Sequence, residues 1–233
     1  MNSALLCALN HTKAVFLLEE LMAVQNNLLT ESLLSDRVLP VLTVRSDEHA
    51  EALGAGLLLG GLHGAEVTLR TPFALSAIRR MHEMGLHVGA GTIMSVADAE
   101  AARDAGAQYL VSPGIVPSVA NWSEQNGLPY VPGVASASEI ISAQAFGCQV
   151  VKAFPASVIG GAEWVKAVSA PIPGVRFIAT GGITDDVLAD YLMIPSLLAV
   201  GGSWFVTGTD VDTITRQIQL LVSRVTEVAR RAA

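Results

Sequence analysis

One lysine lies where a buried amine would be reactive. The chain has only three lysines, Lys13, Lys152 and Lys166. Lys152 ends the apolar run 148–152, which has the composition of a buried strand. Period-two alternation places it on one face with Cys148 and Val150, and we expect this face to point inward and not toward the helices. Burial disfavours the charged form of the amine, and a neutral amine can attack a ketone to form an imine. The same position also fits a lysine that extends to the rim of the fold and pairs with an acid.

A second apolar run, Gly64–Leu69, brings polar groups to the face opposite its apolar side chains. Glu66, Thr68 and Arg70 alternate with alanine, valine and leucine. Inward polar side chains are costly unless they form a satisfied network or serve a site. Either Glu66 and Arg70 pair with each other, or Glu66 moves protons beside an imine while Arg70 grips a substrate carboxylate.

Glycine-rich turns follow three apolar runs. They are Gly89–Thr92, Thr180–Ile183 and Gly201–Ser203. The last two follow the last two strands expected in the chain, where barrels commonly bind phosphate through backbone N–H groups, although turns alone also require glycine. Thr92 and the turn Ser112–Gly114 come at other strand ends, where they either line a pocket or only turn the chain.

The elements that carry these residues alternate regularly. The predicted strands are Val38–Val44, Gly64–Leu69, His87–Ala90, Tyr109–Ser112, Pro129–Val131, Cys148–Lys152, Arg176–Ala179 and Leu197–Val200. Helical spacing marks segments between them, including Asp47–Leu59, Pro72–Met84, Val96–Ala105, Ser138–Phe146 and Ala162–Ser169. Alternation implies parallel strands with helical crossovers, and eight such units favour an α/β fold of the closed (β/α)8 TIM-barrel type over an open doubly wound sheet. No G-x-G-x-x-G follows the first strand, which argues against dinucleotide binding.

We expect one domain over 1–233, with additions at both ends of a barrel core at 38–205. Residues 1–36 form an N-terminal helical extension that covers an end of the barrel. Residues 210–231 form a C-terminal amphipathic helix, because apolar residues recur there at three- and four-residue steps. This stripe packs on the barrel wall or on a neighbouring subunit, and it comprises Val211, Ile214, Ile218, Leu221, Val225 and Val228.

Composition narrows the function classes. The 233 residues are 51% hydrophobic and 15% charged, with a net charge of −7, so the chain is neither disordered nor basic enough for a nucleic-acid partner. No apolar stretch reaches the roughly 20 residues of a membrane span. The two cysteines, Cys7 and Cys148, form no C-x-x-C pair or disulfide framework, and no targeting segment is recognisable at the N-terminus, so we expect a cytoplasmic protein.

Metal-dependent chemistry is not predicted. The five histidines show neither H-x-H nor H-E-x-x-H spacing. Cys148 begins a strand away from the expected mouth of the barrel, so we interpret it as a buried packing residue.

Six motifs in order carry a resemblance to a known family. They are Glu66–Thr71, Gly89–Thr92, Ser112–Gly114, Lys152–Ala156, Thr180–Ile183 and Gly201–Trp204. Over about 38–205 the chain resembles the 2-dehydro-3-deoxy-phosphogluconate aldolase family, also known for 4-hydroxy-2-oxoglutarate aldolase activity. The resemblance implies a cytoplasmic, homotrimeric class I aldolase of the Entner–Doudoroff pathway that uses no metal or other cofactor. Such an enzyme cleaves 2-dehydro-3-deoxy-6-phosphogluconate to pyruvate and glyceraldehyde 3-phosphate, and 4-hydroxy-2-oxoglutarate to pyruvate and glyoxylate.

The resemblance also implies residue roles. Lys152 would form the Schiff base, and Glu66 would be the general acid and base. The residues implied to bind the keto-acid part of the substrate are Arg70, Thr92, Pro113 and Phe154. Those implied to bind its phosphate are Gly181, Gly182, Gly202 and Ser203.

Two positions depart from the family pattern. Ala153 and Ser157 stand where typical members have a second aromatic residue and a glutamate, which bears on substrate preference and not on imine formation. The competing interpretations are a phosphate-binding barrel of another reaction class, such as an isomerase or transferase, and a non-catalytic sugar-phosphate-binding barrel. Either would leave Lys152 without a chemical role.

Overall fold

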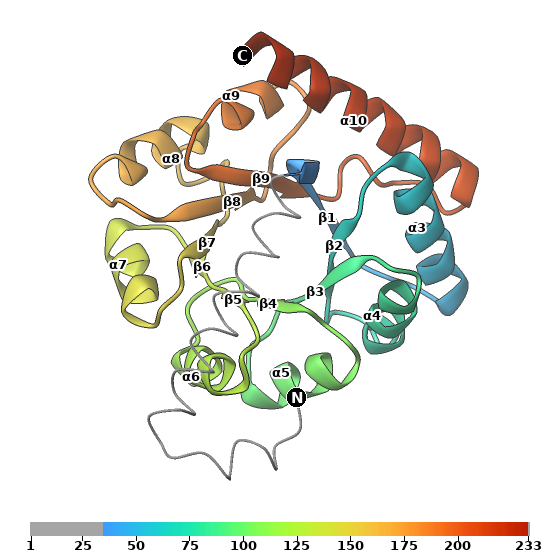
Figure 1. Ribbon diagram of the computed structural model, residues 1–233, viewed down its shortest axis with the longest axis horizontal. Coiled ribbons are helices and arrows are strands. Elements are labelled where there is room, and N and C mark those ends of the chain that lie inside the picture. The colour runs from blue at the N-terminus through green and yellow to red at the C-terminus, as the bar shows by residue number, and fades with distance from the viewer. Residues whose placement is uncertain (1–34, 233) are drawn as a thin grey trace.

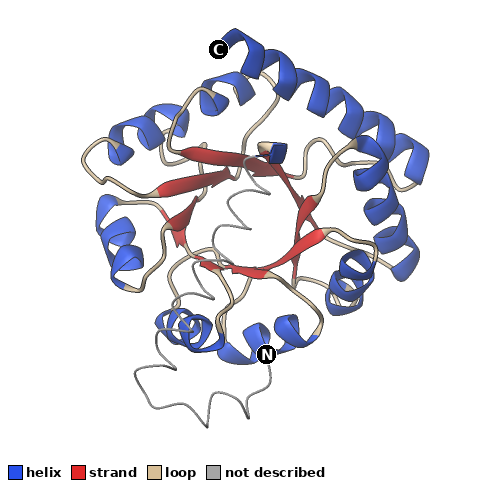
Figure 2. Ribbon diagram, in the orientation of Figure 1, coloured by secondary structure: helices blue, strands red, loops and turns tan. Residues whose placement is uncertain are grey.

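Parallel strands form a ring with helices outside it. The computed structural model describes residues 35–232, and its strands make the inner layer of Figure 2. The strands are β1 (Val38–Leu42), β2 (Gly64–Thr68), β3 (His87–Gly91), β4 (Tyr109–Val111), β5 (Tyr130–Val131), β6 (Gly133–Val134), β7 (Val150–Ala153), β8 (Arg176–Thr180) and β9 (Leu197–Gly202). They pair in parallel in the order β5-β4-β3-β2-β1-β9-β8-β7-β6. The predicted (β/α)8 architecture is confirmed (Figure 1).

The fifth predicted strand, Pro129–Val131, contains β5 alone, and a further short strand that was not predicted, β6, follows Pro132. Proline has no N–H to donate to a neighbouring strand, so the regular ladder is interrupted there. β5 pairs with β4, and β6 pairs with β7. The Pro132 carbonyl accepts a 2.8 Å hydrogen bond from the Lys152 N–H. The two pieces therefore occupy one of eight positions in the ring and close it.

Helices cover the outside of the ring (Figure 1). They are α3 (Asp47–Gly60), α4 (Ala74–Glu83), α5 (Val96–Asp104), α6 (Pro117–Asn126), α7 (Ala137–Ala145), α8 (Gly161–Ser169), α9 (Leu188–Leu192) and α10 (Val211–Ala232). Three of them begin at a serine whose Oγ accepts the backbone N–H three residues later, namely Ser46, Ser95 and Ser136. These caps fix the point at which each strand-to-helix loop ends.

The predicted C-terminal helix is confirmed as α10, and it packs along α3 on the barrel wall (Figure 1). Ile214 and Ile218 of its apolar stripe are fully buried. They lie against Gly56 and Gly60 of α3, where a Cβ atom would come within 2.5 and 2.4 Å of the two isoleucine side chains. The small residues of α3 therefore permit the close approach of the two helices. The predicted N-terminal extension lies outside the described residues, apart from its last two positions.

The barrel separates two apolar clusters. The inner one fills the ring and consists of Leu39, Tyr109, Val111, Val131, Val150, Ile178, Leu198 and Ala199. The outer one lies between strands and helices and includes Cys148. The prediction that Cys148 shares the inner face with Val150 and Lys152 was therefore wrong, because β7 begins only at Val150. Its burial is confirmed. Among residues 35–232, no helix is long and apolar enough to cross a membrane.

Candidate active site

Lys152 and Glu66 meet across the inside of the barrel. The Lys152 Nζ lies 3.0 Å from Oε1 and 3.2 Å from Oε2 of Glu66. The two side chains are only 9% and 2% exposed. β7 and β2 have three strand positions between them in either direction around the ring, so the pair joins opposite walls. The inward orientation predicted for both residues is confirmed, and Lys152 does not extend to the rim.

The Glu66 carboxylate can reach Lys152 because the neighbouring residue in β3 is a glycine, Gly91. A Cβ atom on Gly91 would lie 2.2 Å from Glu66 Oε1 and 2.9 Å from its Cδ. Any other residue at position 91 would displace the carboxylate. The Tyr109 hydroxyl donates a 3.0 Å hydrogen bond to the carbonyl of Ala65, the residue before Glu66, and so connects β4 to β2.

A cavity of about 310 Å³ opens above Lys152. It is lined by Val41, Arg70, Lys152, Phe154, Thr180, Gly181, Gly182, Ile183, Gly201, Gly202, Ser203 and Trp204. These residues come from the ends of β1, β2, β7, β8 and β9 or from the loops that follow them. This is the end of a parallel barrel at which loops from several strands converge, and where active sites of this architecture are found.

The cavity gathers most of the predicted site residues. Phe154 forms one wall, with its ring centroid 5.5 Å from Lys152 Nζ. Arg70 also reaches the cavity, but β2 ends at Thr68 and Arg70 is exposed in the following turn. The prediction that Arg70 shares the inward strand face of Glu66 was therefore wrong. The Glu66 carboxylate pairs with Lys152 and not with Arg70. The Thr68 hydroxyl instead donates to the Leu42 carbonyl at 2.9 Å.

The cavity lining includes neither Thr92 nor Pro113. Thr92 follows Gly91 directly and has a φ of 65°. A left-handed conformation is strained for a β-branched residue, and such strain concentrates at functional positions. Pro113 follows β4, and its carbonyl packs so closely on Gly133 that a Cβ atom there would lie 2.1 Å from the oxygen.

The prediction that Gly201 and Gly202 lie in a turn was wrong, because β9 continues to Gly202 and pairs there with β1. The glycine turn after β8 and the turn that begins at Ser203 after β9 are joined by a polar bridge. Gly181 and Gly182 have φ values of 98° and 72°. The Trp204 indole N–H donates to Asp185 Oδ1 at 3.0 Å, and Arg224 of α10 donates to Oδ2. Hydrogen bonding from the indole, followed by that from the guanidinium, lowers the pKa of the Asp185 carboxyl. The bridge therefore holds both turns and one cavity wall in a fixed relation.

Comparison with known proteins identifies the family of the chain. The family described as KDPG and KHG aldolase matches residues 29–217. The chain belongs to the KDPG and KHG aldolase family. A 2-dehydro-3-deoxy-phosphogluconate aldolase of Treponema pallidum is 43% identical over 183 residues, which are 78% of this chain and 87% of the relative. The chain is therefore an aldolase, a carbon–carbon lyase.

Solved structures of aldolases share the fold. The 2-keto-3-deoxy-6-phosphogluconate aldolase of Zymomonas mobilis with 3-phosphoglycerate is 36% identical, with a TM-score of 0.79 and coverage of 87% of this chain and 97% of that one. The KDPG aldolase of Legionella pneumophila, with pyruvate captured as a covalent carbinolamine intermediate, is 32% identical, with a TM-score of 0.76 and coverage of 85% and 97%.

Sequence reasoning about this aldolase missed part of the cavity. Thr180 ends β8 inside the predicted turn motif, and its hydroxyl is buried with no hydrogen-bond partner. Its position at a strand end was a usable signal. Val41 and Ile183 carried none, because apolar side chains at a cavity resemble those of the core. Within residues 35–232, no three metal-ligating side chains come together.

The two departures from the family pattern lie in different surroundings. Ala153 is fully buried in the outer apolar cluster, away from the cavity. Ser157 packs on the glycine turn, where a Cβ atom on Gly182 would lie 2.0 Å from the Ser157 Oγ. The Ser157 N–H also donates to the Gly181 carbonyl at 3.0 Å. Only the Ser157 position therefore touches the cavity wall.

Proposed function

We propose that this aldolase cleaves 2-dehydro-3-deoxy-6-phosphogluconate to pyruvate and glyceraldehyde 3-phosphate through an imine on Lys152. We extend the proposal to 4-hydroxy-2-oxoglutarate, which would give pyruvate and glyoxylate. One observation carries it: the buried Lys152 amine is paired with the Glu66 carboxylate under a cavity that opens at the barrel mouth. An amine and a proton acceptor within hydrogen-bond reach are the two groups that imine chemistry needs.

Imine formation requires the amine to lose a proton. Glu66 accepts that proton, and the free amine attacks the keto carbon C2 of the substrate to give a carbinolamine. Protonation of its hydroxyl releases water and leaves a protonated imine. The hydrogen bonds of 3.0 and 3.2 Å give a direct path for these transfers, and Gly91 leaves room for the carboxylate to make them.

Cleavage uses the imine as an electron sink. Glu66, directly or through a water molecule, removes the proton of the C4 hydroxyl group. The electrons of the C3–C4 bond then move into the iminium group, which gives an enamine and an aldehyde. Glu66 returns a proton to C3, and hydrolysis of the resulting imine releases pyruvate and restores the amine. Holding all groups in one cavity replaces diffusional encounters with fixed positions.

The remaining residues are assigned to binding. Arg70 and Thr92 hold the substrate carboxylate, because a guanidinium can donate two parallel hydrogen bonds to it. Phe154 and Pro113 exclude water from the pyruvyl half. The turns at Gly181, Gly182, Gly202 and Ser203 take the phosphate through backbone N–H groups and the Ser203 hydroxyl. Arg70 and Phe154 are supported by their place in the cavity lining, as are the four turn residues.

We infer a homotrimer in the cytoplasm. Large apolar side chains are exposed on the helical layer, including Leu59, Ile141 and Leu220, and association would cover part of this surface. The absence of a cysteine framework in the sequence fits a reducing compartment. Sedimentation-equilibrium measurement of the mass tests the subunit number.

Borohydride trapping tests the imine. Pyruvate and borohydride should give a stable pyruvyl adduct visible by intact mass, and Lys152→Ala should lose it. Lys166→Ala is the matched control, because Lys166 is an exposed lysine of α8 paired with Glu163. No adduct on the unmodified chain would refute the imine and favour a phosphate-binding barrel of another class. Comparing turnover of phosphorylated and unphosphorylated 2-keto acids then identifies the preferred substrate.

A further inference from the structure

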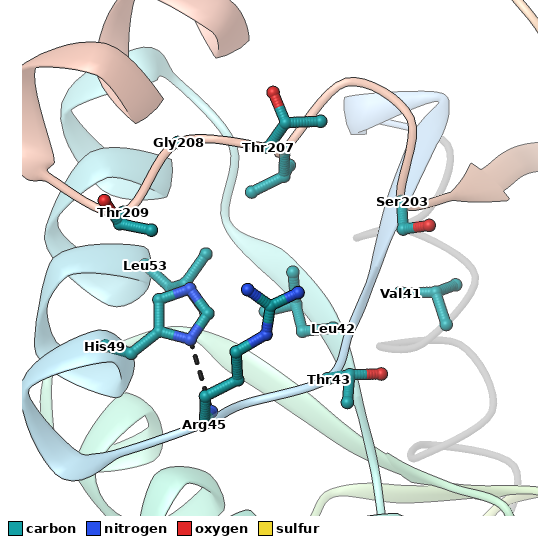
Figure 3. Close-up of a pocket in the computed structure, with 11 residues that line it drawn as sticks. Val41, Leu42, Thr43, Arg45, His49, Leu53, Ser203, Thr207, Gly208 and Thr209 are labelled. Atoms are coloured by element: carbon teal, nitrogen blue, oxygen red, sulfur yellow. Dashed lines mark hydrogen bonds between the residues drawn. The ribbon is translucent and has the colours of Figure 1, made fainter.

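A second cavity lies beside the catalytic one. It has a volume of about 340 Å³ and lies between the end of β1, the start of α3 and the loop from β9 to α10 (Figure 3). Val41 and Ser203 line both cavities. The two spaces are therefore neighbours at the same mouth of the barrel, and neither the imine mechanism nor the glycine turns use the second one.

Arg45 supplies this cavity with a positive charge. Its guanidinium group points into the cavity, between His49 and the β9–α10 loop (Figure 3). The arginines that form ion pairs within residues 35–232 are Arg80, Arg103, Arg224 and Arg231. Arg45 has no such acidic partner in that part of the chain, and no residue lining the cavity is acidic. Its charge is thus available to a ligand.

The groups around Arg45 are suited to donating hydrogen bonds. His49 Nδ1 accepts the Arg45 backbone N–H at 3.3 Å, so the proton of the neutral ring is on Nε2. Burial, and then the charge of Arg45, lowers the pKa of His49 and favours this neutral form. Thr207 and Thr209 in the β9–α10 loop add hydroxyl groups.

The cavity wall is held in place before any ligand binds. Gln217 of α10 accepts the backbone N–H groups of Thr207 and Gly208 at 3.2 and 3.1 Å. Its amide also donates to the Thr207 Oγ1 at 2.7 Å. A preformed wall lowers the ordering cost of binding. Together, an unpaired guanidinium, a ring N–H and hydroxyl groups in a preformed space match an oxyanion with several acceptor oxygens.

We propose that Arg45 and His49 form a second oxyanion subsite that binds a phosphate group next to the catalytic cavity. The phosphate comes either from free inorganic phosphate or from a phosphate monoester whose other end enters the catalytic cavity past Ser203. The subsite differs from the glycine turns, which lie on the other side of Ser203 in the lining of the first cavity. It rests on its own geometry and not on imine formation.

Arginine-directed labelling tests the subsite without any turnover. The full chain is treated with phenylglyoxal in phosphate-free buffer, and modification is read peptide by peptide. Inorganic phosphate and glycerol 3-phosphate are the two probes. We expect saturating probe to slow labelling of Arg45 by about tenfold, which corresponds to a charge-assisted contact. Labelling of Arg79, an exposed arginine of α4, should not change.

The two probes separate the two sources. Protection of Arg45 by glycerol 3-phosphate at concentrations about tenfold lower than those needed with inorganic phosphate assigns the subsite to a phosphate monoester. Equal protection by the two probes at the same concentration assigns it to the free anion. The KM for the phosphorylated substrate should be the same in Arg45→Gln and in the matched control Arg79→Gln, because the phosphate of that substrate is assigned to the first cavity. Equal labelling of Arg45 with and without both probes overturns the proposal. Because labelling needs no reaction, an inactive enzyme that still shows protection would refute only the proposed function.

Discussion

Gly91→Ala moves the Glu66 carboxylate without removing any reactive group. The new Cβ atom would lie 2.2 Å from Glu66 Oε1, whereas ordinary contacts begin at 3.4 Å, so the oxygen must retreat by about 1.2 Å (3.4 − 2.2). Gly91 ends β3 with ordinary strand pairing to Thr68, and its φ is not in the left-handed region. Alanine therefore fits the backbone, and the effect falls on the carboxylate.

The displacement acts on steps that need Glu66. Lys152 keeps its place on β7, so borohydride should still trap pyruvate after long incubation, although more slowly, because Glu66 also accepts the proton of the amine. Proton removal from the C4 hydroxyl group should be slower, because a displacement of the carboxylate by about 1 Å can lower the rate about 100-fold. We expect kcat to fall by about that factor. If the ion pair is lost entirely, the fold loses up to about 3–5 kcal/mol, because a buried charge is left unpaired.

Steady-state kinetics, trapping and thermal unfolding together decide the outcome. Gly114→Ala is the control, since a Cβ atom at this neighbouring mouth position has no atom within 4 Å. It should match the unmodified chain in all three assays. Gly91→Ala with unchanged kcat would refute the argument that the position of Glu66 controls proton transfer. A folded Gly91→Ala chain that traps no pyruvate even after long incubation would contradict the assignment of the imine to the Lys152 amine in its unchanged position on β7.

Three further predictions use other parts of the fold. Asp185→Ala removes the bridge between the two turns, so KM for the phosphorylated substrate should rise about fivefold with kcat unchanged, the size of one hydrogen bond. Burial raises the pKa of the Cys148 thiol to about 12, so iodoacetamide at pH 8 should label it on the order of 1000-fold more slowly in the native chain than in the unfolded one. Gly56→Ala places a Cβ atom 2.5 Å from Ile214, whereas Gly54→Ala meets only the flexible end of a methionine. Gly56→Ala should therefore be less stable than Gly54→Ala by about 1–3 kcal/mol in urea unfolding.

Each of these three predictions has an outcome that would contradict it. For Asp185, equal KM changes on phosphorylated substrate and on 4-hydroxy-2-oxoglutarate would mean a general disturbance and not a bridge between phosphate turns. For Cys148, rapid native labelling, read on its own peptide, would show that the thiol is accessible. For the α3 pair, equal urea midpoints would show that α10 does not depend on close contact with Gly56.

Much of the barrel could be read from local patterns. Parallel strands buried on both faces are short apolar runs, and the helices between them have a three- to four-residue spacing, so eight units were recognisable along the chain. The limits of this reasoning appear at Pro132, which is followed by the unpredicted strand β6, and at Arg70, which lies beyond the end of β2. Both concern element ends, which depend on hydrogen bonds to neighbouring strands as well as on local residue preference.

The candidate active site was also predictable from the sequence only in part. The sequence alone determined that Lys152 and Glu66 lie in two strands, each on one face, because side chains alternate along any strand. It also determined that a glycine turn follows β8, whereas Gly201 and Gly202 belong to β9 itself. Only the tertiary structure decided that Lys152 pairs with Glu66 across the ring, that Gly91 makes room for the pair, and that Arg45 faces a second cavity. These contacts join segments far apart in the chain, and their partners are set by ring closure and by packing.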